Sequence, residues 1–91
     1  MKRELTISNK LGLHMRAASK LVQLASGFDP EISLFCNGQS ADAKSLLEVL
    51  QLAGTQGTPL TIEANGDHED EEAEALDQIS ELINDKFGEG E

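Results

Sequence analysis

The chain has 91 residues, enough for one domain with a single modest core but too few for two domains. Its formal net charge of −10 argues against nucleic acid as a partner, because binding phosphates requires a basic face. No apolar run approaches the roughly 18 residues of a membrane-spanning helix, and the first residues lack the apolar stretch of a secretory signal. The lone Cys36 cannot form an internal disulfide, so we expect one cytoplasmic domain over residues 1–91, without membrane insertion.

The charges are distributed unevenly along the chain. Twelve of the 17 acidic residues lie from Glu63 onward, and we interpret this acidic part as the solvated face of a helix. Five of the 7 basic residues lie near the start of the chain, namely Lys2, Arg3, Lys10, Arg16 and Lys20. The N-terminal region is therefore locally positive on an acidic protein.

The first half of the chain predicts a strand, a helix and a hairpin. Residues 3–7 alternate polar and apolar side chains, as a half-buried strand does. From Met15 the apolar residues recur with helical spacing, and we expect Gly27 to follow this helix as its C′ residue. Residues 31–36 and 39–42 predict two strands joined by a tight Asn37-Gly38 turn. The apolar stripe of the helix comprises Ala18, Leu21, Val22 and Ala25.

The second half predicts a short helix, a strand and a long final helix. The short helix covers residues 44–54, with Gly54 as its stop, and residues 58–64 form the fourth strand. The last helix extends from about residue 68 to residue 86, and we expect the tail over residues 88–91 to fray. Its apolar stripe comprises Ala73, Leu76, Ile79, Leu82, Ile83 and Phe87.

The predicted order is β-α-β-β-α-β-α, without internal repeats or a linker. Strands with one polar face and helices with one apolar stripe favour two layers, a four-stranded sheet with the helices on one side. Because the strands alternate clearly, the sheet is expected to be mainly antiparallel. The predicted fold class is therefore α+β, of the split βαβ type.

His14 occupies the position just before the helix that begins at Met15. The N–H groups of a first helical turn lack partners within the helix and attract an anion. Arg16 lies in that turn, where its guanidinium can reach the same anion. Because a neutral imidazole is a nucleophile near neutral pH, His14 and Arg16 are candidates for a site that carries a phosphoryl group. On this pattern alone, an ordinary histidine at a helix cap remains the simpler interpretation.

Ser45 begins the leucine-rich helix, and Glu48 completes a capping-box pattern. The structural interpretation of Ser45 is an N-cap, and the functional one is a regulatory phosphorylation site, since phosphate would add about −1.5 to −2 charges there. The helix has more apolar residues than one inward face can bury, so some must be exposed and indicate a partner. The residues concerned are Leu46, Leu47, Val49, Leu50 and Leu52.

Two further side chains are interpreted structurally. Cys36 beside the hairpin is expected to pack in the core, and His68 is expected to face solvent. No cysteine or histidine cluster has the spacing of metal ligands, and no glycine-rich phosphate loop follows a strand. We therefore expect neither a metal nor another cofactor, and no nucleophile–base pair supports a hydrolase.

Three blocks of sequence, in this order and spacing, are specific for one family. They are NKLGLHMRAA over residues 9–18, NGQSADAKSLLEVLQLA over residues 37–53, and GTPLTIEANGDHEDEEAEAL over residues 57–76. They resemble the phosphohistidine motif, the hairpin with the regulatory serine, and the final strand-to-helix passage of the HPr family. These are the phosphocarrier proteins of the bacterial phosphoenolpyruvate-dependent phosphotransferase system, and the resemblance covers residues 2–87.

The resemblance implies an open-faced β-sandwich with three helices on one side of a four-stranded antiparallel sheet. His14 would accept a phosphoryl group on Nδ1 from phosphorylated enzyme I and pass it to an enzyme IIA domain, assisted by Arg16, without turnover of its own. Ser45 would match the serine that HPr kinase/phosphorylase modifies. The chain would act as a monomer with transient partners, through a docking face comprising Met15, Lys20, Leu46, Leu47 and Leu50.

The chain departs from the family pattern at two positions near His14. Ala17 stands where many members have proline, and Leu11 stands where serine or asparagine is common. An alanine keeps the helix but restores one N–H donor, so we expect an altered rate of transfer and not its loss. The NKLG run before His14 resembles proteobacterial and nitrogen-branch relatives, which leaves sugar uptake and nitrogen-linked regulation both open.

Two alternative functions remain. The first is an HPr-like regulatory module that acts mainly by docking to a kinase or a transcriptional regulator, with little phosphoryl flux through His14. The second is a small metal-handling or assembly domain of the same strand and helix order, which the missing ligand cluster disfavours.

Overall fold

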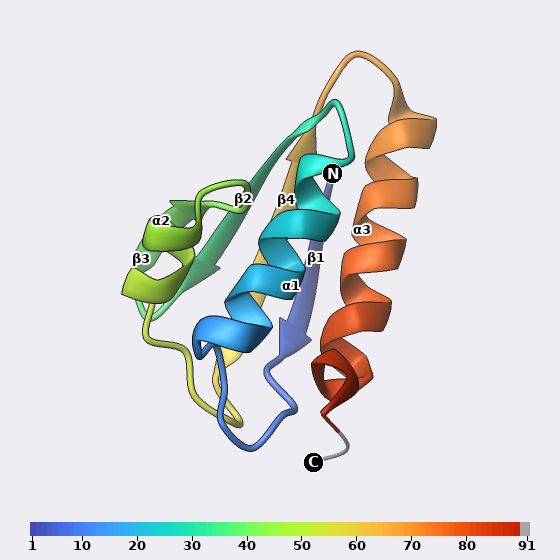
Figure 1. The fold of residues 1–91 in the computed structure, drawn as a ribbon. Helices are drawn as coiled ribbons and strands as arrows, with labels where there is room; N and C mark the ends of the chain where they lie inside the picture. Colours follow the sequence, from blue (N-terminus) through green and yellow to red (C-terminus); the bar gives the residue numbers. More distant parts are fainter. Residues whose placement is uncertain (90–91) are drawn as a thin grey trace.

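The computed structural model describes residues 1–89, and its elements follow the predicted order (Figure 1). A short 3-10 turn, η1, follows the last helix and was not expected from the sequence. No helix among the described residues is both long and apolar enough to span a membrane. The elements are β1 (Lys2–Thr6), α1 (Met15–Ser26), β2 (Glu31–Cys36), β3 (Gln39–Asp42), α2 (Leu46–Gln51), β4 (Pro59–Asn65), α3 (Glu69–Asn84) and η1 (Lys86–Gly88).

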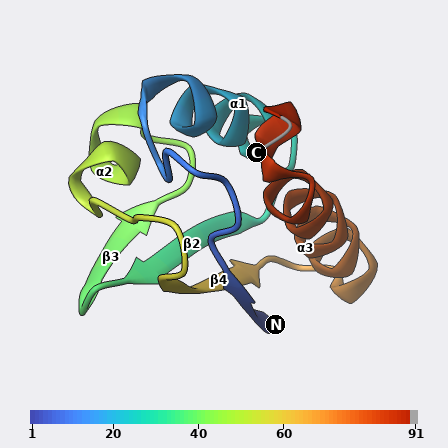
Figure 2. The same ribbon diagram turned by 90° about the horizontal axis from the view of Figure 1, so that it is seen from below.

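The four strands form one antiparallel sheet in the order β1-β4-β2-β3. In the central pair, Leu34 of β2 lies opposite Ile62 of β4, and both side chains point toward the helices. Figure 2 shows α1, α2 and α3 together on one side of the sheet, with the other side open. The expected open-faced α+β arrangement is confirmed.

The core fills the space between the sheet and the helices. The two central strands, β2 and β4, bury every second residue, as the pleat requires, while β3 buries only Ala41. Helices α1 and α3 each contribute one face. On α1 the buried residues are Ala17, Ala18, Leu21 and Ala25, so Ala17 takes the place expected for Val22, which is only partly buried. This packing fixes the start of α1, where the candidate site lies.

The two glycines predicted to end helices do not have the left-handed φ that is usual for such a residue. Gly27 ends α1 with a φ of −80° and not in the left-handed region, because its N–H closes a tighter turn onto the Leu24 carbonyl. The left-handed residue after α2 is Ala53, with a φ of 53°. Gly54 instead provides space, since a Cβ there would meet the Ile7 Cδ1 at 2.5 Å.

The last helix also differs from its prediction in detail. It buries Ala75 where Ala73 was expected, and Leu82 is only partly buried, because the inward face of the helix is rotated relative to the predicted stripe. The buried residues of this face are Glu72, Ala75, Leu76, Ile79, Ser80 and Ile83. Gly88 and Glu89 do not fray: the chain turns back over the start of α1. Residues 90 and 91 of the expected frayed tail lie outside the described residues.

Candidate functional site

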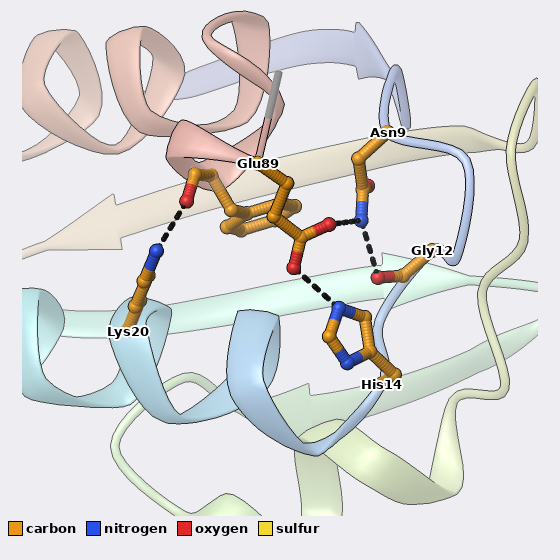
Figure 3. Close-up of polar contacts among 6 residues, drawn as sticks. Asn9, Gly12, His14, Lys20 and Glu89 are labelled. Carbon is orange, nitrogen blue, oxygen red and sulfur yellow. Dashed lines mark hydrogen bonds and ion pairs between the residues drawn. The ribbon is translucent and has the colours of Figure 1, made fainter. Parts of the chain in front are cut away.

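The loop between β1 and α1 carries the candidate histidine and is held by several hydrogen bonds. Asn9 accepts a hydrogen bond from the Gly12 N–H through its carbonyl at 3.2 Å, which closes a turn. The Asn9 side chain then donates from Nδ2 to the Gly12 carbonyl at 2.8 Å (Figure 3). Asn9 is fully buried, and the Leu13 N–H beyond the turn donates to the Gly54 carbonyl at 2.9 Å. The loop is therefore held in one conformation against the segment after α2.

Gly12 is required at this turn for two independent reasons. Its φ of +69° lies in the left-handed region, which other residues enter at a cost. A Cβ at Gly12 would also collide with the Gly54 carbonyl oxygen and lie 2.9 Å from the Thr55 Cα. These neighbours are backbone atoms and cannot rotate away, so the two glycine-containing segments pack main chain against main chain.

His14 is the N-cap residue of α1, with extended backbone angles, but its side chain does not cap the helix. The His14 carbonyl accepts from the Ala18 N–H at 2.8 Å, which is the first hydrogen bond of the helix. The N–H groups of Met15, Arg16 and Ala17 consequently have no acceptor inside the helix. His14 thus stands next to three backbone donors and the positive end of a helix dipole, at the position that the sequence predicts.

Glu89, 75 positions away in sequence, lies against the His14 ring. One carboxylate oxygen of Glu89 contacts the His14 Nε2, and the other accepts from the Asn9 Nδ2 at 3.0 Å (Figure 3). The Glu89 side chain is 11% exposed and that of His14 is 27% exposed. Figure 3 shows the Nδ1 of His14 turned away from this carboxylate, and Nδ1 has no hydrogen bond to residues 1–89.

The segment that brings Glu89 to His14, residues 86–89, is called the C-terminal strap below. Phe87 is fully buried, and the Lys20 Nζ donates to its carbonyl at 2.6 Å. Lys86 and Phe87 both have a φ of 55°, a conformation that costs non-glycine residues about 1 kcal/mol or more each. Burial of Phe87 contributes about 1.5–3 kcal/mol, which offsets much of this cost, and the bond from Lys20 also holds the strap.

The hydrogen bond from Asn9 holds the pKa of the Glu89 carboxyl below its usual value. The hydrogen bond with His14 and the positive charges of His14 and Arg16 act in the same direction, against the opposing effect of burial. A carboxyl whose pKa is lowered on folding contributes stability above the unfolded value, about 4.3, and loses it as the pH falls through the lowered native value.

We therefore expect Glu89 to hold Asn9 and His14 at neutral pH and to release them only at a pH below the ordinary range of a glutamate, when its carboxyl becomes protonated. Backbone amide NMR shifts of Gly88 and Lys20, followed from pH 7 to pH 2, measure this release. In Glu89→Gln the same shifts should lose this acid transition. A transition that persists unchanged in Glu89→Gln would show that another carboxyl controls it.

The other predicted site residues lie around α1 and α2, which are neighbours in Figure 2. Arg16 is exposed in the first turn of α1. Met15 is 58% exposed and Leu47 is 68% exposed, which confirms that part of the leucine-rich helix faces solvent. Of the other residues expected to form a docking face, Lys20 holds the strap, whereas Leu46 and Leu50 are half-buried against the core.

Ser45 is the N-cap of α2, and its Oγ accepts from the Glu48 N–H at 3.4 Å. The reciprocal bond of a capping box is not present, because the Glu48 carboxylate accepts from the Asp42 N–H at 3.0 Å. The Ser45 N–H donates to the Asp42 carbonyl, also at 3.0 Å. The predicted capping box is therefore only half formed, and Ser45 holds α2 weakly.

The chain that carries this site matches a known family. The family model described as the PTS HPr component phosphorylation site matches residues 1–85. The chain belongs to the HPr family. The protein is thus an HPr phosphocarrier of the phosphotransferase system.

Proteins named HPr and proteins named NPr are both among the similar relatives of this chain. The phosphocarrier protein HPr of Cupriavidus necator is 45% identical over 91 residues, covering 100% of this chain and 99% of the relative. The phosphocarrier protein NPr of Shewanella violacea is 44% identical over 89 residues, covering 98% and 94%. A crystal structure of HPr from Thermoanaerobacter tengcongensis has a TM-score of 0.90, at 36% identity and with 98% and 97% covered.

Asn9 and Glu89 are the site residues that sequence reasoning missed. The sequence assigns the asparagine only to a loop, although asparagine is common in turns, where its side chain hydrogen-bonds nearby backbone groups. Here the Asn9 Nδ2 donates to the Gly12 carbonyl. Glu89 stands in a Gly-Glu-Gly-Glu tail whose composition resembles a frayed end. The only local signal for the strap is Phe87, a large apolar residue that must find a place in the core.

Proposed function

We propose that the protein accepts a phosphoryl group on the Nδ1 of His14 from phosphorylated enzyme I and passes it to an enzyme IIA domain. The observation that carries this proposal is the position of His14 at the start of α1, with Nε2 engaged by Glu89 and Nδ1 turned away from it. The phosphoryl oxygens would receive hydrogen bonds from the first-turn amides, which are already in place before transfer. The protein would contribute position and charge and no cofactor chemistry.

The experiment is phosphorylation of the purified protein by phosphoenolpyruvate and enzyme I. A phosphate that is lost in acid but stable in base, and that passes on to an enzyme IIA domain, supports the proposal. A phosphate that survives acid, or no phosphate at all with an active enzyme I, contradicts it.

Arg16 is proposed to bind the phosphoryl oxygens, because it lies in the first helical turn and is exposed. Arg16→Gln should slow phosphoryl transfer about tenfold, the low end for a charged hydrogen bond at an exposed position. Arg16→Lys, which keeps the charge but not the guanidinium fork, should give an intermediate rate. Lys10→Gln is the matched control, since Lys10 is an exposed cation in the same loop. Equal slowing in both glutamine variants would show a general charge effect.

Ser45 is proposed as a regulatory phosphorylation site for HPr kinase/phosphorylase. It lies beside Leu47 on the docking face, where a new negative charge would have to be desolvated against a partner. Ser45→Asp should slow transfer from enzyme I by about tenfold or more. Ser40→Asp, a serine exposed on β3, should transfer at the normal rate. A normal rate in Ser45→Asp would contradict the regulatory role.

A further inference from the structure

We propose that Glu89 is a positioning residue for His14, held in place by the C-terminal strap, and that it directs phosphorylation to Nδ1. This inference rests on the proposed function, which it deepens by assigning a role to a residue at the far end of the chain. Its first support is the contact itself, because a carboxylate oxygen of Glu89 lies against the His14 Nε2.

The contact determines which ring nitrogen carries the hydrogen. An ionised carboxylate has only acceptor atoms, so the imidazole nitrogen that faces Glu89 must be the donor. In the neutral ring the hydrogen is then on Nε2, and the lone pair is on Nδ1. The lowered pKa of Glu89 keeps this carboxyl ionised at neutral pH, so the preference is present under working conditions.

The carboxylate is oriented by several groups and not by His14 alone. The Asn9 Nδ2 donates to its second oxygen at 3.0 Å, while the same Nδ2 donates to the Gly12 carbonyl at 2.8 Å. Asn9 thus links the strap to the loop that carries His14. Behind the carboxylate, buried Phe87 and the 2.6 Å bond from Lys20 fix the backbone of the strap. Two consecutive left-handed residues, Lys86 and Phe87, aim the chain at His14 despite their conformational cost.

Arg16 and Lys20 are the cations near this pair on α1. Arg16 acts on the charge of Glu89 from the first turn of α1, and Lys20 is engaged by the Phe87 carbonyl. Glu89 is therefore held between the histidine and positive charge on one side and the Asn9 amide on the other. The role of Glu89 resembles that of the third residue of a catalytic triad, which orients a histidine without touching the transferred group.

Phosphoryl transfer to His14 requires no proton to leave the imidazole ring. The lone pair on Nδ1 attacks phosphorus, and the bond from phosphorus to the donor on enzyme I breaks with its electron pair remaining on the donor. The ring, still carrying the Nε2 hydrogen, becomes positively charged, and the Glu89 carboxylate balances that charge. In the onward transfer the electron pair of the P–N bond returns to Nδ1, which restores the neutral ring with its hydrogen on Nε2.

The test compares Glu89→Ala and Glu89→Gln with the control Glu71→Gln, an exposed glutamate in the first turn of α3. The first readout is the ¹⁵N shifts of the two His14 ring nitrogens at about pH 8.5, where an unperturbed histidine is neutral. Wild type and Glu71→Gln should show the hydrogen on Nε2, whereas Glu89→Ala should show a mixture of both tautomers. This readout needs no phosphorylation, so it can fail or succeed independently of the proposed function.

The second readout is the rate at which each variant accepts a phosphoryl group from phosphorylated enzyme I. Glu89→Ala should be slowed about tenfold, the low end for one lost hydrogen bond to a charged group, and Glu89→Gln should be slowed less. Unfolding curves check that the variants remain folded. Unchanged tautomers and rate in Glu89→Ala would overturn the inference. A faster rate in Glu89→Ala would also overturn it, because Glu89 would then obstruct the site.

Discussion

Replacing His14 with alanine is expected to abolish acceptance of the acid-labile phosphate from phosphoenolpyruvate and enzyme I. The loss should be a factor of about 1,000 or more, to background, since no other group supplies the nucleophile. The fold should survive, because the His14 side chain is partly exposed and contacts only Glu89 among hydrogen-bonding partners in residues 1–89. The measurement is incorporation of labelled phosphate followed by acid treatment.

The chain provides its own control for this experiment in His68, the second histidine. His68 is the exposed N-cap of α3 and also lacks a side-chain capping bond, so it resembles His14 in local position. His68→Ala should accept phosphate at the wild-type rate. Phosphorylation that persists in His14→Ala and disappears in His68→Ala would place the acceptor at the other helix start.

The second large effect is expected from Gly12→Ala, which should lower the free energy of unfolding by about 2–4 kcal/mol. Of this, about 1 kcal/mol comes from forcing alanine to the left-handed φ of +69°. A further 1–3 kcal/mol, roughly, comes from the collision with the Gly54 carbonyl oxygen and the Thr55 Cα. The loop must move to relieve the collision, so phosphate acceptance by His14 should fall as well. Urea unfolding and the labelling assay measure the two effects.

Gly57→Ala separates the two contributions. Gly57 also has a positive φ, +86°, but a Cβ there would meet nothing within 4 Å. Its substitution should therefore cost about 1 kcal/mol and leave phosphate acceptance unchanged. If both variants lose the same stability, the close contact between the Gly12 and Gly54 segments has no energetic role.

Elements that depend on neighbouring residues could be predicted from the sequence. The hairpin is one example: Asn37 and Gly38 have φ values of 54° and 74°, as the dipeptide predicts, and β2 and β3 have their expected bounds. The start of α1 is another, because apolar spacing alone places the first turn directly after His14. These features need no information from distant parts of the chain.

Features that depend on distant contacts could not be predicted. Gly54 was expected to end a helix, whereas its role follows from the approach of Ile7 and Leu13, which are more than 40 positions away. Glu89 offers no periodic or motif signal, and its place at His14 follows from the burial of Phe87 and the bond from Lys20. Their roles become visible only when the complete packing is known.

Ala17, where many family members have proline, now has a structural context. Its side chain is fully buried on the inward face of α1, and its N–H is one of the first-turn donors. A proline here would remove one of the three first-turn donors that we propose for the phosphoryl oxygens. The alanine therefore leaves this chain with one more backbone donor beside His14 than a proline-containing relative.

The proposed carrier of the phosphoryl group is the Nδ1 of His14. The most direct test is NMR of the ¹⁵N-labelled protein after phosphorylation by phosphoenolpyruvate and enzyme I, where a ³¹P–¹⁵N coupling identifies the bonded nitrogen. We expect coupling to the Nδ1 of His14, with the Nε2 hydrogen retained beside Glu89. Coupling to Nε2 would contradict the role of Glu89, and coupling to His68 or to no histidine nitrogen would contradict the assignment of His14 itself.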